Sequence, residues 1–222
     1  MFCDSNVSGS VDQHNNIAFF SFISVLGVLF DLDGTLIDST DVHLYSFLDA
    51  LDALGIPRKP GVEDRFRSEV GKRFIDIVMD LYPELGEEQI RAIRQKKWEF
   101  TPKYLDRIRV LPHVYDSLNA LHGKYPLALV TSASRKFVQW VFGATNPSLG
   151  MYFDVVVSAE DVSHGKPDPE PFIIAASRLN VDTAVVVGDT EYDRIAAIRA
   201  GFSFVHAKEM ERLPEILADL SK

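Results

Sequence analysis

The chain contains one cysteine, Cys3, among its 222 residues, so it cannot form an internal disulfide bond. Such low cysteine usage is typical of proteins from a reducing compartment and predicts a cytoplasmic location. The uncharged run at residues 17–30 spans only 14 residues, fewer than the roughly 20 apolar residues that cross a bilayer. It also lacks the basic start of a secretory signal. We therefore expect no membrane partner and no disulfide scaffold.

Positive charge is also scarce, with 23 basic against 32 acidic side chains and a net charge of −9. This balance argues against nucleic acid as a partner. Residues 41–109 hold 13 basic and 13 acidic side chains, so the whole excess of negative charge belongs to the rest of the chain. An acidic region repels an anionic substrate unless a bound cation inverts the local field.

Two carboxylates follow an apolar segment near the N-terminus. Residues 25–30 are typical of a buried parallel strand, and Asp31, Asp33 and Gly34 come directly after them. Ligands of open α/β sheets bind beyond the carboxyl ends of the strands. Asp-Gly is also common turn chemistry, but a turn does not explain Asp31, because two neighbouring carboxylates repel each other. The pair predicts metal binding, attack on a phosphorus atom, or both.

Three further segments place polar side chains at similar positions. The segment LALVTS ends in Thr131 and Ser132, GKPDP carries Lys166 between glycine and proline, and VVVGDTEYD ends in Asp189 and Asp193. Each pattern alone is weak, because Thr-Ser is common in turns and lysine is common on surfaces. The four segments are informative together, because they follow one another in a definite order along the chain.

The pattern from Pro112 onward alternates between helices and strands. We predict strands over 127–130, 153–157, 184–187 and 202–205, and helices over 114–121, 136–142, 169–179, 193–200 and 213–220. This alternation favours a parallel sheet with helices on both faces.

No strand pattern occurs between residues 41 and 109, where apolar residues recur at helical spacing after a cap at Ser39 or Thr40. We therefore divide the chain into three parts. Residues 25–40 and 111–222 form an α/β core, and residues 41–110 form an all-helical unit. Residues 1–24 are an N-terminal extension, either disordered or upstream of a true start near Val25.

The four segments, in this order, resemble the motifs of the haloacid dehalogenase-like hydrolase superfamily. The resemblance covers about residues 25–222 and implies a Rossmann-like parallel sheet core with an inserted helical cap. A cap directly after the first motif is typical of the branch that contains phosphoglycolate phosphatases and β-phosphoglucomutases.

The resemblance also implies roles for the acidic residues. Asp31 is similar to the nucleophile that forms an aspartyl-phosphate, and Asp33 to the acid and base that protonates the leaving oxygen and then activates water. The implied cofactor is Mg²⁺, held by Asp31, the backbone carbonyl of Asp33, and Asp189, with Asp193 as a supporting acid.

The remaining candidates contact phosphate or substrate. Thr131 and Lys166 are similar to the family's catalytic hydroxyl and lysine. The implied substrate-binding residues are Gly34, Ser132, Ala133, Arg135, His43, Lys72 and Arg73.

Details of the motifs favour one reaction over others. The dehalogenase members lack an acid at the position of Asp33, so dehalogenation is not expected. His43 and the segment SASR resemble the mutases, whereas the GDxxxD motif resembles the phosphatases. Phe74 stands where the mutases carry a phosphate-binding arginine. Lys72 or Arg73 can substitute for that arginine. We expect a phosphatase acting on a small phosphorylated metabolite, as a monomer or homodimer. The alternatives are a sugar-phosphate mutase and a non-catalytic phosphate-binding module.

Overall fold

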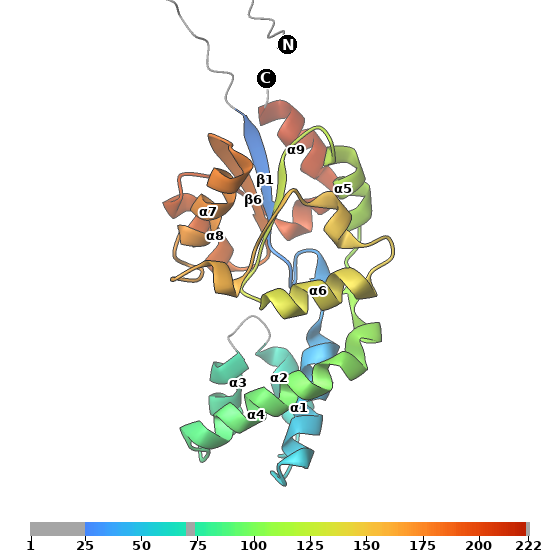
Figure 1. The fold of residues 1–222 in the computed structure, drawn as a ribbon, viewed down its shortest axis with the longest axis vertical. Coiled ribbons are helices and arrows are strands. Elements are labelled where there is room, and N and C mark those ends of the chain that lie inside the picture. Colours follow the sequence, from blue (N-terminus) through green and yellow to red (C-terminus); the bar gives the residue numbers. More distant parts are fainter. Residues whose placement is uncertain (1–24, 70–73, 221–222) are drawn as a thin grey trace, which may run out of the picture.

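A computed structural model describes residues 25–69 and 74–220 of the chain (Figure 1). Five parallel strands form its central sheet, in the order β5-β4-β1-β6-β7. The strands are β1 (Leu26–Phe30), β4 (Leu127–Val130), β5 (Val155–Val157), β6 (Thr183–Gly188) and β7 (Ser203–His206). This parallel sheet with helices around it confirms the predicted α/β fold class.

The middle of the sheet is built from apolar segments that are buried on both faces. Val28 of β1 pairs with Leu127 of β4 and with Val185 of β6, and all three are at most 1% exposed. Because side chains alternate along a strand, Val28 belongs to one hydrophobic cluster and Leu29 to another on the opposite face. The parallel pairing brings the carboxyl ends of β4, β1 and β6 to one edge.

Helices cover both faces of this sheet. On one face lie α5 (Val114–Leu121), α6 (Arg135–Ala144) and α9 (Leu213–Leu220), whose buried residues join the cluster of Val28. On the other face, α7 (Glu170–Leu179) and α8 (Glu191–Arg199) join the cluster of Leu29. Short 3-10 helices connect these elements: η2 (Leu149–Tyr152), η3 (Ala159–Asp161) and η4 (Ala207–Arg212).

A second group of helices lies beyond the carboxyl edge of the sheet (Figure 1). It consists of α1 (Thr40–Ala53), α2 (Val62–Ser68), α3 (Phe74–Leu81), α4 (Glu87–Phe100) and η1 (Thr101–Arg107). The first four have a hydrophobic cluster of their own, in which Phe47 stacks on Phe66 and meets Tyr82 edge-on.

A two-stranded antiparallel ribbon joins the helical group to the sheet. The expectation that residues 41–110 are all helical is therefore wrong at residues 109–110, which form a strand. Strand β2 (Ile37–Asp38) pairs with β3 (Arg109–Val110), with Ile37 opposite Val110. Strands of two residues are too short to give an alternating pattern, so the sequence carries no signal for them.

Two helix starts differ from the prediction. Ser39 precedes α1, but its hydroxyl makes no capping bond, and the carboxylate of Asp38 accepts from the first N–H at Thr40 instead (3.0 Å). Helix α8 begins at Glu191, because Thr190 and Asp193 form a capping box. The predicted extension at residues 1–24 and the candidates Lys72 and Arg73 lie outside the described residues. Among the helices of 25–69 and 74–220, none has the length and apolar character needed to cross a membrane.

Candidate functional site

The polar residues predicted from the four segments gather at the carboxyl edge of the sheet. Asp31 follows the central strand β1, Thr131 follows β4, and Asp189 follows β6. Backbone bonds extend the sheet to these residues: the N–H of Asp31 donates to Val187 (2.9 Å), and that of Thr131 donates to Val157 (2.9 Å). The strands therefore fix the positions of these three residues relative to one another.

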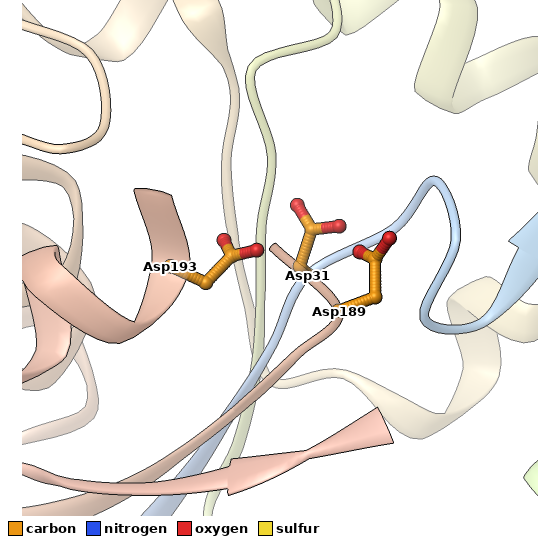
Figure 2. A group of neighbouring side chains, drawn as sticks. All are labelled: Asp31, Asp189 and Asp193. Carbon is orange, nitrogen blue, oxygen red and sulfur yellow. The ribbon is translucent and has the colours of Figure 1, made fainter. Parts of the chain in front are cut away.

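Three carboxylates face one another at this edge (Figure 2). One oxygen each from Asp31, Asp189 and Asp193 lies within 4.8 Å of the others. Burial raises the pKa of Asp31 to about 7, although Lys166 opposes the shift, and burial also raises the pKa values of Asp33 and Asp189. Oxygen ligands held this close suit a hard divalent cation, whose charge would offset the cost of burying the carboxylates.

Lys166 supplies the positive charge inside this cluster. Its Nζ atom lies 2.5 Å from Oδ1 of Asp31 and 2.7 Å from Oδ1 of Asp193, and it also donates to the carbonyl of Val130 (3.3 Å). Burial disfavours the ammonium, but Asp31 and Asp193 outweigh this effect and raise the pKa of Lys166 to about 12. The lysine is therefore a permanent cation beside Asp31.

Asp193 has both carboxylate oxygens engaged by protein groups. Oδ1 accepts from Lys166, while Oδ2 accepts from the backbone N–H (3.1 Å) and the hydroxyl of Thr190. A Cβ at Gly188 would lie 2.6 Å from Cβ of Asp193, so only glycine allows this approach. These contacts suit Asp193 to orienting Lys166 more than to holding a cation directly.

Residues after β1 shape the other side of the cluster. Gly34 has a φ of +84°, and a Cβ there would overlap the Asp189 carboxylate. The Thr35 hydroxyl donates to Oδ1 of Asp189 (3.2 Å), and the Ser39 hydroxyl donates to Oδ1 of Asp33. The sequence analysis did not identify Thr35 or Ser39 as site residues.

The turn after β4 exposes backbone near the cluster. Thr131 is buried, and its Oγ1 accepts from the N–H of Ala133 (3.0 Å). Ser132 is exposed, and Ser134 caps α6 by accepting from the N–H of Phe137 (3.2 Å). The guanidinium of Arg135 pairs with Asp161 (2.8 Å). Arg135, which was predicted to bind substrate, therefore forms an ion pair with Asp161 in this structure.

The helical group contributes a lysine that the sequence analysis missed. Lys97 of α4 is only 3% exposed, and its Nζ lies 2.9 Å from Nδ1 of His43. The His43 ring packs on Phe137, with the ring centroids 4.9 Å apart. Burial lowers the pKa of Lys97 to about 7, although Asp33 opposes this shift, and Lys97 in turn opposes the rise that burial causes in the pKa of Asp33. Lys97 therefore belongs to the electrostatic surroundings of Asp33, and His43 contacts Lys97.

Glu170 at the start of α7 holds the loop that carries Lys166. Its carboxylate accepts from the N–H groups of Ser163 (2.7 Å) and His164 (2.9 Å) and lies 2.9 Å from Nδ1 of His164. Arg199 of α8 donates to the carbonyl of Pro167 (3.2 Å) on the other side of the lysine. Glu170 directly follows the GKPDP segment, and the sequence analysis did not identify it as a site residue.

This parallel sheet, with helices on both faces and an acidic cluster and a lysine at its carboxyl edge, defines a Rossmann-like α/β class of protein. The family model for haloacid dehalogenase-like hydrolases matches residues 28–207. The chain is 35% identical over 185 residues to the pyrophosphatase PpaX of Bacillus velezensis, covering 80% of each chain. It is 33% identical over 204 residues to a phosphoglycolate phosphatase of Salmonella typhimurium, covering 80% of this chain and 79% of that one.

A solved structure shares the fold. The crystal structure of a predicted phosphoglycolate phosphatase from Haemophilus somnus superposes with a TM-score of 0.74 at 21% identity, covering 87% of this chain and 97% of that one. The chain belongs to the haloacid dehalogenase-like hydrolases. Membership of this family, with phosphatases among its relatives, confirms the predictions of the family and of a phosphatase-type hydrolase.

Proposed function

We propose that the protein is a magnesium-dependent phosphatase that hydrolyses a small phosphate ester through an aspartyl-phosphate at Asp31. The observation that carries this proposal is the position of the Asp31 carboxylate. It stands at the end of the central strand, 2.5 Å from the Lys166 ammonium and grouped with Asp189. A nucleophile beside a fixed cation is what attack on an anionic phosphoryl group requires.

The reaction proceeds in two steps. A carboxylate oxygen of Asp31 attacks the phosphorus, the bond to the leaving oxygen breaks, and Asp33 donates a proton to that oxygen. Asp33 then takes a proton from water, whose oxygen attacks the phosphorus, so that inorganic phosphate leaves and the Asp31 carboxylate is restored. Burial raises the pKa of Asp33, which suits a group that must give and take a proton near neutral pH.

The fixed groups of the site support the transferred phosphoryl group. Lys166 neutralises charge shared by Asp31 and the phosphate, while the hydroxyl of Thr131 and the backbone N–H of Ser132 offer donors to its oxygens. Asp31, Asp189 and the backbone carbonyl of Asp33 would hold Mg²⁺. When bound, this ion supplies charge neutralisation at the phosphoryl oxygens.

We further propose that helices α1–α4 cap the site and admit the substrate. They pack around a separate hydrophobic cluster, they connect to the core through the β2–β3 ribbon, and they bring Lys97 to the surroundings of Asp33. The names of the two relatives support a small substrate, since pyrophosphate and phosphoglycolate are both compact phosphate compounds.

The test is phosphate release from a panel of small phosphate esters, with and without Mg²⁺, by the native protein and by Asp31→Asn. We expect magnesium-dependent release that falls at least about 1,000-fold in Asp31→Asn, because the amide is a poor nucleophile. Circular dichroism and the unfolding midpoint check that the variant is folded. Substantial release by folded Asp31→Asn would reject Asp31 as the nucleophile.

A further inference from the structure

The turn between β4 and α6 is tied to the short helix η3 by hydrogen bonds and an ion pair. The carbonyl of Ala133 accepts from the N–H of Ala159 (3.0 Å). The carboxylate of Glu160 accepts from the N–H of Arg135, the first residue of α6 (2.8 Å), and the guanidinium of Arg135 pairs with Asp161 (2.8 Å). The first N–H groups of a helix have no partner within the helix, so Glu160 supplies one from outside. Helix η3 therefore holds both the backbone and a side chain of this segment.

Asp161 is the central group of this connection, and its side chain is only 8% exposed. Oδ2 accepts from the N–H (2.9 Å) and the hydroxyl (2.7 Å) of Ser158, which follows β5, and Oδ1 accepts from the guanidinium of Arg178 of α7 (3.0 Å). Burial opposes the ionisation of Asp161, but the bonds from Ser158 and the two arginines hold its pKa well below the ordinary value. One buried carboxylate thus connects β5, α7 and the start of α6.

The same turn borders the place where the phosphoryl group would bind. The carbonyl of Val130, the last residue of β4, accepts from Nζ of Lys166 (3.3 Å), and this ammonium stands beside Asp31. Two residues further on, Ser132 is exposed, and its N–H has no acceptor within residues 25–69 and 74–220. The N–H of Ala133 is already bound within the turn. The N–H of Ser132 is therefore a backbone donor that the turn can offer to an anion.

We propose that Glu160 and Asp161 are positioning residues that hold the β4–α6 turn so that the N–H of Ser132 faces the phosphoryl group. This inference rests on the proposed phosphatase function and adds two residues outside the acidic cluster. It also gives Arg135 a different role from the predicted one, because its guanidinium anchors the turn to Asp161 and is not a ligand of the substrate. A donor held in place before phosphate binds loses little conformational freedom on binding, so its contribution to affinity is larger.

Charge and positioning predict opposite effects when these carboxylates are removed. If charge alone acts, the loss of a negative group near a phosphate site strengthens phosphate binding. If positioning acts, the same loss weakens it. The test is the Kd of inorganic phosphate in the presence of Mg²⁺, measured by calorimetry. We expect Asp161→Asn to raise this Kd by about tenfold, the effect of one charged hydrogen bond, and to lower kcat/KM by a similar factor.

Two pairs of variants provide matched controls. Glu160→Gln and Glu160→Ala remove the same charge, but only the glutamine keeps an acceptor for the N–H of Arg135. Glu160→Gln should therefore bind phosphate as the native protein does, whereas Glu160→Ala should bind it more weakly. Arg135→Met and Arg178→Met each remove one cation from Asp161, but only Arg135 connects it to the turn. Arg135→Met should raise the Kd by about tenfold, and Arg178→Met should raise it by less than about twofold.

The outcomes separate this inference from the proposed function. If the native protein releases phosphate from no ester with Mg²⁺, the phosphatase function is wrong, while the Kd values still test the turn because they need no turnover. If the native protein does not bind inorganic phosphate, the inference is rejected. Unchanged or tighter binding by folded Asp161→Asn also rejects it, since tighter binding is expected when Arg135 is released to act as a ligand. Circular dichroism checks folding, and if Asp161→Asn does not fold, equal Kd values for the two variants of the exposed Glu160 reject the inference.

Discussion

The Nζ atom of Lys166 donates a hydrogen bond of 2.7 Å to Oδ1 of Asp193, and both side chains are buried. The other oxygen of Asp193 is held by the backbone N–H and hydroxyl of Thr190, at the start of α8. This helix therefore fixes the carboxylate, and the carboxylate fixes the ammonium beside Asp31. The position of the cation depends on a residue that need not touch substrate.

Asp193→Asn should reduce both activity and stability. A neutral amide does not balance the charge of Lys166, so the ammonium is held less firmly beside Asp31. We expect kcat to fall at least about tenfold, and we expect the free energy of unfolding to fall by about 2 kcal/mol, within the range for breaking buried charged pairs. Steady-state kinetics and urea unfolding measure the two effects.

Asp52→Asn is the control, since Asp52 pairs with Arg58 on the surface, where both side chains are more than 40% exposed. It should change stability by less than about 1 kcal/mol. An Asp193→Asn protein with native kcat would show that Thr190 and Asp193 serve only to start the helix.

The metal-free protein should lose stability as the pH rises from about 4 to 7. The pKa of Asp31 is raised from 3.8 to about 7, so in this window the folded state binds more protons than the unfolded state. The free energy of unfolding must then fall with rising pH, by about 3 kcal/mol for this group. Lys166 does not contribute in this window, because its pKa is raised to about 12 and it stays charged.

Urea unfolding at pH 5 and pH 7.5 in a chelator measures this dependence, with Asp31→Asn as the comparison. The variant lacks the ionisable group, so its stability should depend less on pH. Mg²⁺ should stabilise the native protein more at pH 7.5 than at pH 5, because the carboxylates must lose protons to bind it. Identical pH profiles for the two proteins would contradict the raised pKa of Asp31.

Most of the site could be predicted because its residues stand at the ends of strands. Asp31, Thr131 and Asp189 each follow an apolar run, and parallel pairing of those runs brings them to one edge. Lys166 comes from a loop, and only the order of the four motifs distinguished it from a surface lysine. Local pattern and sheet geometry therefore determine this part of the site together.

Lys97 could not be predicted, because its burial is a tertiary property. It stands in the charged segment RQKKWEF, where adjacent Lys96 is 40% exposed and pairs with Glu99. Nothing local distinguishes the two lysines, and only the packing of α4 against α1 buries one of them beside His43. The contact of Ser39 with Asp33 could not be predicted either, because it depends on the turn that follows β1. From the sequence alone, Ser39 was expected only as a helix cap.

Gly34→Ala should disable the proposed metal site. The new Cβ would overlap the Asp189 carboxylate, and the φ of +84° is unfavourable for alanine. Displacing Asp189 removes a proposed ligand, so we expect kcat/KM with Mg²⁺ to fall about 100-fold. The thermal stabilisation by Mg²⁺ should also be lost.

Gly55→Ala is the matched control for this change. Gly55 also has a positive φ, of +66°, but no atom lies within 4 Å of the added Cβ. It should cost about 1 kcal/mol of stability and leave turnover and the response to Mg²⁺ as in the native protein. Similar losses of activity in both variants would trace the effect to backbone strain and remove the support for Asp189 as a ligand.

Glu170→Ala should slow catalysis from outside the acidic cluster. The Glu170 carboxylate accepts from the N–H groups of Ser163 and His164, and these bonds hold the loop that ends in Lys166. Without them the ammonium spends less time beside Asp31, so kcat should fall about tenfold. Glu170→Gln keeps one acceptor oxygen and should lie between the native protein and Glu170→Ala.

Glu209→Gln is the control for the loss of a surface carboxylate, because Glu209 pairs with Arg212 in the same helical segment and has no other ion-pair partner within residues 25–69 and 74–220. It should leave kcat as in the native protein. The graded order of the Glu170 variants separates loop anchoring from net charge, since Glu170→Gln and Glu170→Ala remove the same charge. Equal kcat values for those two variants would mean that charge alone, and not the hydrogen bonds to the loop, connects Glu170 to Lys166.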